Sequence, residues 1–497
     1  MPESNPDVLV IGGGPAGSTA ARLLVEWGHS VTLIAKQDGR PNIAESLPPS
    51  VAKLLEHIGA LDAVDASGFY RTTGNTVWWG DPQGRSENFS AGAEGYQIAS
   101  ARFEDLLLEL ARHAGVRLIR GAAREVAFGE DGAEVTYESD GEQRVERCAW
   151  VLDCSGRAGV IAKRGLRQPV AGRRTLALVR VWTSNKSWDL PDPTHTLVES
   201  YQDGWAWSIP VSPTERHTTV MVDPTLTDLT RGADISRMYD AELAKAPRMH
   251  QIALGGSPVG ESFACNASQY TASEVTGDRF LLVGDAASGI DPLSSFGVKK
   301  ALASGWMAAV VTNTCLRDEA MRRPALEFYD RREREAYSSL VALAERFYRD
   351  AADTHDHPYW LVRGEASEAP VVDAISPVDV KALKTQPDVV AAFEALKAAP
   401  GVKLRASAAM SFAPGPAVQG REVVLEEQIV SPWTPHGIRY LRDIDLPALA
   451  RMAQDFGQVP ELYDAYNSRH APVILPDFLG ALAVLLGKGI LVNELSD

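Results

Sequence analysis

The sequence lacks the features that mark several large classes of protein. Its 497 residues include only four cysteines, with no C-x-x-C pair and no histidines at zinc-binding spacing. We therefore expect free thiols in a reducing compartment and no structural metal. A basic excess is also missing, because the net charge is −16, and this argues against binding to a nucleic-acid backbone.

The chain also has little that would direct it to a membrane. The few residues before the first apolar run leave no room for a signal peptide. Residues 478–492 are strongly apolar but contain Lys488 and several glycines, and they are too short to cross a bilayer. These observations predict a cytoplasmic protein without membrane contact, in which residues 478–492 form a buried or docking helix.

An apolar run that enters a glycine turn lies almost at the start of the chain. Residues 8–11 are typical of a buried strand, and the G-x-G-x-x-G pattern of Gly12, Gly14 and Gly17 follows at once. The first two glycines let the backbone turn tightly close to a ligand, and Gly17 permits close packing of a helix on the strand. Free N–H groups at the start of that helix would face an anion. The pattern predicts a site for a dinucleotide pyrophosphate.

The remaining hydrophobic patterns predict an α/β protein with three parts. Strand and helix patterns alternate in residues 1–175 and 265–345, which predicts a discontinuous Rossmann-like domain. Alternating residues dominate between 176 and 264 and predict an inserted antiparallel β-sheet that forms the floor of a substrate site. Residues 378–497 predict a small, mostly helical C-terminal domain.

Several further motifs follow the glycine turn in a fixed order, and together they resemble the FAD-dependent monooxygenase superfamily. Within it, the chain is similar to the branch that contains the flavin-dependent halogenases. The motifs that carry the resemblance are residues 12–17, Glu45-Ser46-Leu47-Pro48-Pro49, Arg102, Asp153-Cys154-Ser155-Gly156-Arg157, residues 204–210, and Gly284-Asp285-Ala286-Ala287 running into Asp291-Pro292-Leu293.

The resemblance implies FAD as the cofactor and a set of residues that would hold it. Arg102 would pair with the pyrophosphate, Asp285 would accept hydrogen bonds from the ribityl chain, and residues 292–298 would bring backbone N–H groups to the flavin pyrimidine edge. The full set is Gly12, Gly14, Pro15, Ala16, Gly17, Lys36, Glu45, Ser46, Arg102, Val126, Asp285, Pro292, Gly297 and Val298.

One position departs from the usual dinucleotide site. The acidic residue that holds the adenosine ribose would stand near Ala35, but alanine is followed there by Lys36. Ribose recognition must therefore differ. Lys36 either reaches the ribose or a phosphate, or it is simply exposed.

The same resemblance raises two competing reactions. Trp205-x-Trp207-x-Ile209-Pro210 matches a signature of the flavin-dependent halogenases, although core packing also explains its tryptophans. Those enzymes direct hypohalous acid with a lysine, and their tryptophan-halogenating members add a glutamate. The matching positions here are Thr72 and Ser294, and Phe296 replaces a small hydroxyl residue beside the halide site.

We therefore expect a monooxygenase that hydroxylates an electron-rich aromatic ring through a flavin C4a-hydroperoxide. Halogenation of an aromatic substrate is the first alternative, and a non-oxygenating flavin oxidoreductase or flavin-binding protein is the second. His217 on the inserted sheet and Asp291 beside the flavin loop are candidates for a base that restores aromaticity, although a structural role is the commoner explanation of each.

The resemblance also suggests partners. The halogenase-like branch includes flavoproteins that hydroxylate a tryptophan of a partner protein during maturation of cysteine tryptophylquinone, as in quinohemoprotein amine dehydrogenase. A polypeptide is therefore a specific hypothesis for the aromatic substrate. NADH or NADPH would supply electrons, either directly or through a flavin reductase.

Overall fold

The computed structural model describes residues 5–36, 42–81, 83–227, 234–365, 383 and 385–495. The chain divides into two compact units. The first consists of Met1–Leu316 and Tyr329–Val372, and the second of Arg317–Phe328 and Asp373–Asp497.

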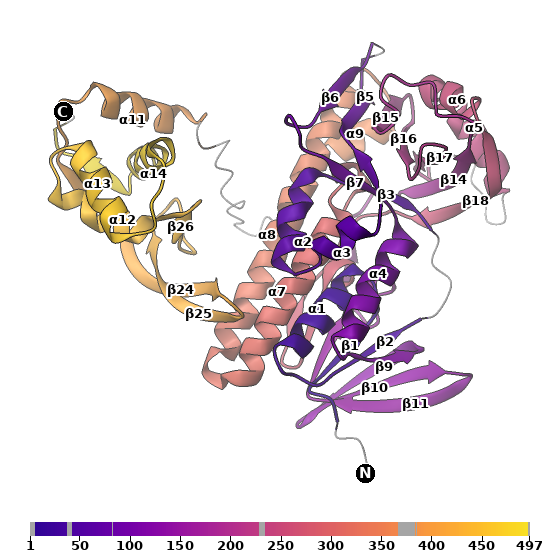
Figure 1. Ribbon diagram of the computed structural model, residues 1–497, viewed down its shortest axis with the longest axis horizontal. Coiled ribbons are helices and arrows are strands. Elements are labelled where there is room, and N and C mark those ends of the chain that lie inside the picture. The colour runs from indigo at the N-terminus through magenta and orange to yellow at the C-terminus, as the bar shows by residue number, and fades with distance from the viewer. Residues whose placement is uncertain are drawn as a thin grey trace. The chain divides into compact units, whose positions relative to one another are not determined.

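A mostly parallel sheet forms the centre of the first unit, with the strand order β20-β21-β12-β1-β2-β8. Every residue of β1, β2 and β12 is buried, as expected for apolar strands covered on both faces. In Figure 1, helices α1 (Pro15–Glu26), α4 (Ser100–His113) and α7 (Gly297–Arg317) run beside this sheet. Its strands are β1 (Val8–Ile11), β2 (Val31–Ala35), β8 (Arg117–Arg120), β12 (Trp150–Asp153), β20 (Thr276–Gly277) and β21 (Phe280–Leu282). This is the expected Rossmann-like core.

Smaller sheets and helices surround the core. A three-stranded antiparallel sheet has the order β11-β10-β9, and two others have the orders β3-β7-β4 and β13-β19-β22. The short helices α2 (Ala52–His57) and α3 (Leu61–Ala66) follow β3 in the chain. The strands are β3 (Ala44–Leu47), β4 (Tyr70–Thr72), β7 (Gly95–Ala99), β9 (Ala122–Gly129), β10 (Gly132–Ser139), β11 (Glu142–Cys148), β13 (Arg167–Pro169), β19 (Tyr270–Ala272) and β22 (Ser288–Gly289).

The inserted sheet is larger than its sequence pattern indicates. The order of this sheet, called the large sheet below, is β18-β14-β17-β16-β15-β5-β6. Strands β5 and β6 come from earlier in the chain, and β5 pairs in parallel with β15. The alternating pattern contains no information on this recruitment, because it is a pairing over a long sequence distance. The strands are β5 (Gly74–Trp78), β6 (Arg85–Asn88), β14 (Leu176–Thr183), β15 (Thr196–Tyr201), β16 (Gly204–Pro210), β17 (Glu215–Val222) and β18 (Ser257–Asn266).

Different elements pack against residues on the two faces of the large sheet. One face packs in a cluster with α5 (Ile235–Leu243) and α6 (Pro247–Ala253). The opposite face packs with α8 (Glu319–Ala352) and α9 (Pro358–Gly364), and the same cluster includes Leu293 from the predicted flavin loop. The second face, called the inner face below, is therefore the one beside the predicted flavin loop.

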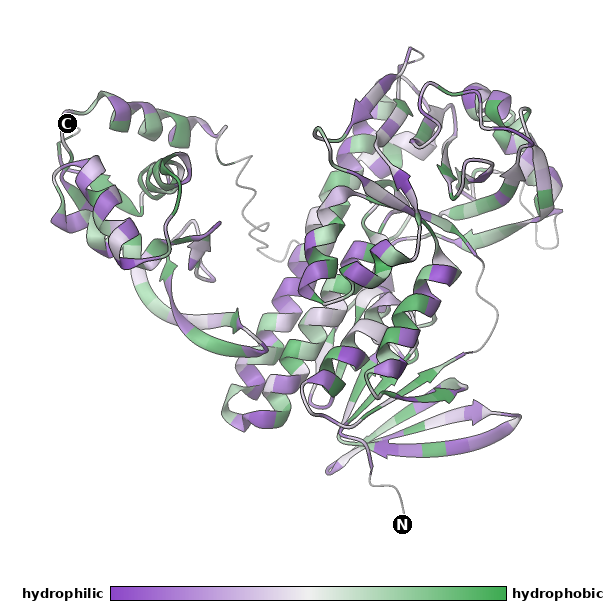
Figure 2. Ribbon diagram, in the orientation of Figure 1, coloured by the Kyte–Doolittle hydropathy of each residue, from purple (hydrophilic) through white to green (hydrophobic). Residues whose placement is uncertain are grey.

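The second unit has its own apolar core. Its helices are α11 (Pro387–Ala398), α12 (Leu446–Met452), α13 (Val459–Arg469) and α14 (Leu475–Gly487). Its strands are β23 (Leu404–Ala406), β24 (Ser411–Gln419), β25 (Glu422–Val430), β26 (Tyr440–Leu441), β27 (Ile444–Asp445) and β28 (Leu491–Asn493). Figure 2 shows α14 mainly in the hydrophobic colour, and its Phe478, Leu482 and Leu485 are buried in this core. Residues 478–487 of the apolar stretch are thus part of a core helix, whereas Leu491 and Val492 belong to β28. No described helix is both long enough and apolar enough to span a membrane.

Candidate functional site

The glycine turn between β1 and α1 is held in close contact with the end of β12. Gly12 has a φ of +106°, and a Cβ atom added there would lie 2.4 Å from the carbonyl oxygen of Cys154. A Cβ atom at Gly17 would lie 1.9 Å from the carbonyl oxygen of Gly12. Both positions therefore require glycine, since the obstructing atoms belong to the backbone. These approaches fix the start of α1 at the carboxyl ends of β1 and β12.

The N-terminus of α1 is suited to bind an anion. Gly14 is its N-cap residue, no side chain caps the helix, and Pro15 occupies the first turn without an acidic neighbour. The N–H groups of Ala16 and Gly17 therefore have no intrahelical partner and carry the positive end of the helix dipole. A glycine cradle at an uncapped helix start fits the pyrophosphate of FAD.

The motif that contains Asp285 meets the same helix from a distant part of the chain. Gly284, with a φ of +62°, lies so close that an added Cβ atom would be 3.3 Å from the Cβ atom of Ala16. A Cβ atom on Gly305 of α7 would be 2.4 Å from the carbonyl oxygen of Ala16. The glycine turn, the Asp285 turn and α7 are thus brought together around the first turn of α1.

Two cations lie near the Asp285 carboxylate. Arg157 Nε is 3.9 Å from Oδ2, and Lys300 Nζ is 4.0 Å from Oδ1. Lys300 is buried and donates hydrogen bonds to the carbonyl oxygens of Gly284 and Ser288, at 2.9 and 2.8 Å. Sequence reasoning missed Lys300. Its only signal is a lysine at the start of an otherwise apolar helix, which is too common to identify a site.

Asp291 holds the next turn in place through its side chain. Oδ1 accepts a hydrogen bond from the N–H of Leu293 at 2.9 Å, and Oδ2 accepts from Tyr348 Oη at 2.9 Å and from Gln269 Nε2 at 3.2 Å. Burial raises the pKa of Asp291. Because both carboxylate oxygens already accept hydrogen bonds, this geometry favours a structural role over that of a free base. Tyr348 and Gln269 lie far from Asp291 along the chain and left no signal in the sequence.

The predicted flavin loop continues from this turn into α7. Ser295 has a φ of +54°, and α7 then begins at Gly297. A Cβ atom on Gly297 would be 3.8 Å from Oε2 of Glu45, on β3. Pro292 lies in the turn, buried Val298 lies in the first turn of α7, and Ser46 follows Glu45 on β3. The structure thus places Glu45 and Ser46 on the strand beside the start of α7.

Three residues that the sequence predicts to bind FAD lie outside the turns described above. Lys36 is exposed just after β2. Arg102 is exposed on α4, donates a hydrogen bond to the carbonyl of Ser67 and has its guanidinium carbon 5.0 Å from the centre of the Phe69 ring. Val126 is buried on β9. The roles of these three residues in binding FAD remain predictions.

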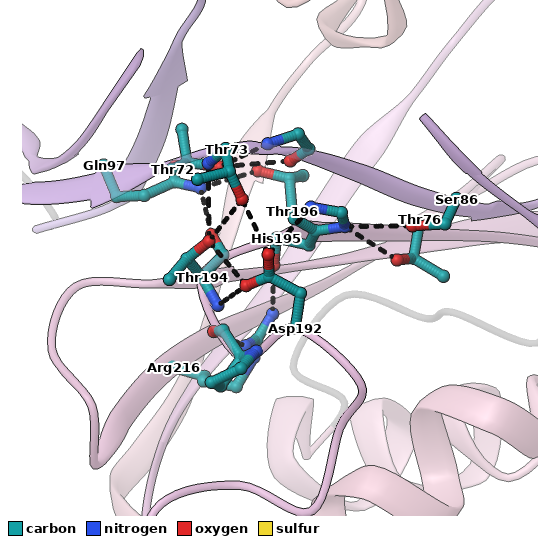
Figure 3. A network of polar contacts seen from close by, with 12 residues as sticks. Thr72, Thr73, Thr76, Ser86, Gln97, Asp192, Thr194, His195, Thr196 and Arg216 are labelled. Carbon is teal, nitrogen blue, oxygen red and sulfur yellow. Dashed lines mark hydrogen bonds and ion pairs between the residues drawn. The ribbon is translucent and has the colours of Figure 1, made fainter. Parts of the chain in front are cut away.

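Figure 3 shows the polar network around Thr72. The Thr72 side chain is fully buried, and its hydroxyl donates to the carbonyl of Gly74 at 3.0 Å. Thr73 Oγ1 donates to Asp192 Oδ2 at 2.7 Å, and Gln97 Nε2 donates to Thr196 Oγ1 at 3.0 Å. The Thr73 bond attaches residues 72–76 to the segment before β15, and the Gln97 bond joins β7 to the first residue of β15.

The tryptophans of the W-x-W-x-I-P signature differ in exposure. Trp205 is fully buried, whereas Trp207 is only partly buried. The ring centres of the two lie 4.9 Å apart, and Trp79 lies 6.0 Å from Trp205, all with edge-to-face geometry. Trp205 is therefore a core residue, and Trp207 is the member that retains accessible surface.

His217 also lies on the large sheet. Its side chain is only 2% exposed, and Nε2 lies 3.3 Å from Glu215 Oε1. Burial lowers the pKa of His217, although the Glu215 carboxylate acts in the opposite direction. Burial therefore favours the neutral form of the imidazole.

Glu45 gives a testable pH dependence. Burial, together with the nearby carboxylates of Glu104 and Asp285, raises its pKa from 4.5 to about 7. Folding then favours the protonated form, so the stability that Glu45 provides is present at low pH and lost as pH rises through about 7. Between pH 4.5 and about 7, we expect the free energy of unfolding of the wild type to fall relative to that of Glu45→Gln, by up to about 3 kcal/mol. Denaturant titrations at several pH values measure this difference, and parallel pH profiles would contradict the prediction.

Comparison with known proteins agrees with this geometry. Residues 5–342 match the family described as FAD binding domain. The chain is 29% identical over 389 residues to a tryptophan 2-halogenase of Chondromyces crocatus, a match that covers 76% of this chain and 74% of the relative. The flavin-dependent halogenase CmlS has a TM-score of 0.79 at 22% identity, covering 99% of this chain and 96% of CmlS. The peptidyl tryptophan dihydroxylase QhpG has a TM-score of 0.69 at 22% identity, covering 98% of this chain and all of QhpG.

The protein is an oxidoreductase of the FAD-dependent monooxygenase superfamily, with FAD as its cofactor. Within that superfamily the chain is similar to the flavin-dependent halogenases. CmlS and QhpG each share the fold over nearly the whole chain, C-terminal unit included.

Proposed function

We propose that this protein hydroxylates an electron-rich aromatic ring with dioxygen and reduced FAD. The proposal rests on the burial and the hydrogen bond of the Thr72 side chain. Its hydroxyl is buried and bonded to Gly74, where the resemblance would place the lysine of a halogenase. Ser294, where a glutamate would stand, donates its hydroxyl to the carbonyl of Asp291 at 2.9 Å. These two positions offer neither an amine nor a carboxylate to direct a halogenating species.

The residues of the chain have separate tasks in this proposal. Bound FAD supplies the electrons and the oxygen-activating chemistry. The N–H groups at the start of α1 bind its pyrophosphate, and Asp285 accepts hydrogen bonds from the ribityl hydroxyls. The backbone N–H groups of Gly297 and Val298, at the start of α7, would stabilise negative charge at the pyrimidine edge. Trp79, Trp205 and Trp207 provide an apolar wall that keeps water from the reacting ring.

A tryptophan side chain of a polypeptide is the specific substrate that we put forward. The full-length fold similarity to QhpG supports this choice. NADH or NADPH supplies the electrons, either by direct reduction of the flavin or through a separate flavin reductase. Stopped-flow reduction by each nicotinamide, with and without an added reductase, distinguishes these routes.

The reaction type is tested by product mass. We expect a tryptophan-containing peptide, incubated with enzyme, FAD, a flavin reductase, NADH and air, to gain the mass of one or two oxygen atoms. The gain follows the isotope of the oxygen when labelled dioxygen is supplied, and it is the same with and without bromide. A bromine-containing product that requires bromide would overturn the proposal.

Halogenation is the second candidate, and specific observations favour it. The Trp205 and Trp207 signature is retained, and the relative with 29% identity is named a tryptophan halogenase. The ammonium group of Lys299 lies 5.3 Å from the centre of the Phe296 ring and donates to Ser50 Oγ at 2.9 Å. If a brominated product forms, Lys299→Met shows whether that ammonium group directs the halogen.

A further inference from the structure

The inner face of the large sheet carries polar side chains on β17. Alternate residues of a strand share a face, so His217 and Thr219 lie on the same side as Met221. Met221 packs in the cluster that contains Trp205 and Leu293. His217 and Thr219 therefore face the side of the sheet on which the predicted flavin loop lies.

The neighbouring strand completes a surface for a flat ring. Across the β16 and β17 pairing, Trp207 lies opposite Thr219 and Ile209 lies opposite His217. β16 also packs against β3, which carries Glu45 beside the start of α7. An aromatic side chain that retains accessible surface is thus adjacent to two polar groups, on the face that is turned toward the flavin site.

Several polar atoms of this face have no hydrogen-bond partner. They are His217 Nδ1, Thr219 Oγ1 and Trp205 Nε1, and each is buried without a partner among the described residues. Buried polar groups in folded proteins are normally paired, because an unpaired one loses its hydration without compensation. Trp205 belongs to the core, but His217 Nδ1 and Thr219 Oγ1 lie beside the partly buried Trp207 and indicate a place where a ligand supplies the missing partners.

The contact with Glu215 fixes the chemical state of the imidazole. A carboxylate only accepts hydrogen bonds, so the proton of the neutral ring lies on Nε2, 3.3 Å from Glu215 Oε1. Nδ1 therefore carries the free lone pair. The arrangement of a carboxylate behind a histidine also stabilises the imidazolium that forms when Nδ1 accepts a proton.

We propose that His217 Nδ1 binds the ring N–H or O–H group of the aromatic substrate and acts as its base, with Thr219 as a second polar contact. The substrate class that follows is an indole or a phenol rather than a ring without such a donor. This inference rests on the proposed function, since it names the substrate class of the same site.

The proton balance of the step is simple. As a ring carbon bonds to one oxygen atom of dioxygen, Nδ1 takes the N–H or O–H proton, which raises the electron density of the ring. The second oxygen atom leaves as water, with two electrons from reduced FAD and two protons. The substituted carbon then loses its hydrogen as a proton, aromaticity returns, and His217 gives its proton back to the ring nitrogen or oxygen.

Binding to the oxidised holoenzyme tests the recognition part. The probes are N-acetyltryptophanamide with its 1-methylindole analogue, and 4-methylphenol with 4-methylanisole. We expect the donor-bearing member of one pair to bind about 3- to 10-fold more tightly, the contribution of one neutral hydrogen bond. His217→Leu removes this preference. The inference is overturned if no pair shows the preference in the wild type, or if His217→Leu keeps it.

A further variant at His217 separates the hydrogen bond from the base. His217→Asn keeps an acceptor but not a base, so it retains the binding preference while the rate of product formation falls about 100-fold. Thr219→Val weakens the preference. Thr218→Val is the matched control, because Thr218 lies on the other face and donates to Ser208 Oγ at 3.0 Å, and it leaves the preference unchanged.

The outcomes also separate this inference from the proposed function. The binding assay contains no reductant, so it reports donor recognition whatever the product is. A brominated product with intact donor preference would reject hydroxylation and keep the recognition by His217. A hydroxylated product at the wild-type rate from His217→Asn, with a wild-type flavin spectrum, would reject the base and keep the proposed function.

Discussion

Gly17→Ala is expected to purify without bound FAD, with the dissociation constant for FAD raised at least about 100-fold. The added methyl group would lie 1.9 Å from the carbonyl oxygen of Gly12 and 3.0 Å from the Cβ atom of Cys154. The first of these is a backbone atom and cannot rotate away, so the start of α1 must move from β1. Overpacking of this kind costs about 1–3 kcal/mol or more, and about 1.4 kcal/mol changes the binding constant tenfold.

Fluorescence titration of the apoprotein with FAD measures this effect. Gly129→Ala is the matched control, because the nearest atom to its added methyl group is the carbonyl oxygen of Gly132, at 3.8 Å. The control belongs to the same unit and should bind FAD as the wild type does. Wild-type affinity in Gly17→Ala would mean that the glycine cradle does not hold the pyrophosphate.

Arg363→Met is expected to lower the free energy of unfolding by about 3–5 kcal/mol. The side chains of Arg363 and Asp223 are only 2% and 3% exposed, and Nη2 of Arg363 lies 2.9 Å from Asp223 Oδ2. Removing the guanidinium leaves a buried carboxylate without its counter-charge. The pair also matters for the candidate site, because Arg363 lies on α9 with Trp360. The Trp360 ring centre is 5.4 Å from that of Trp79, and both rings pack in the cluster on the inner face of the large sheet.

Denaturant titration of the variant measures the loss. The double variant Asp223→Leu with Arg363→Met is expected to recover part of the stability, because neither charge is then left buried alone. Arg144→Ala provides the control for an exposed pair, since Arg144 and Glu142 are 49% and 71% exposed. It should change the stability by less than about 1 kcal/mol. Equal effects of Arg363→Met and Arg144→Ala would contradict the prediction.

The fold was largely predictable where short-range pattern dictates local structure. The apolar residues 8–11 and the following glycines predicted β1, the turn and α1, because such a strand is covered on both faces and such a turn excludes side chains. The pairing of β5 with β15 was not predictable. A strand's residues show that it is half buried, but they do not show which distant strand lies beside it.

The site was predictable to a smaller extent. The ordered motifs identified FAD and placed Asp285 and Glu45 among its candidate ligands. The structure brings the Asp285 turn beside α1 and α7, and Glu45 beside the start of α7. The environments of these residues were not predictable. The pKa of Glu45, raised to about 7, depends on burial and on carboxylates that the chain brings near it only after folding.

Asp291 and His217 show most clearly what the sequence predicted and what only the folded contacts decide. The sequence could name both as bases, but it had no means to rank them. Tyr348 and Gln269 occupy one oxygen of Asp291 and the Leu293 N–H occupies the other, whereas His217 keeps a buried and unpaired Nδ1. The contacts that occupy the Asp291 oxygens include two from distant elements, α8 and the segment before β19.

The sequence by itself therefore determined the cofactor and the superfamily, and it predicts that Thr72 and Ser294 stand where halogenases carry a lysine and a glutamate. These properties depend on residue types at fixed spacing, which set local backbone geometry and local chemistry. Only the tertiary structure decided which polar atoms are left free to meet a substrate. That outcome depends on strand register and on packing between distant segments, because a hydrogen bond in the folded chain is formed with whichever group is brought within reach.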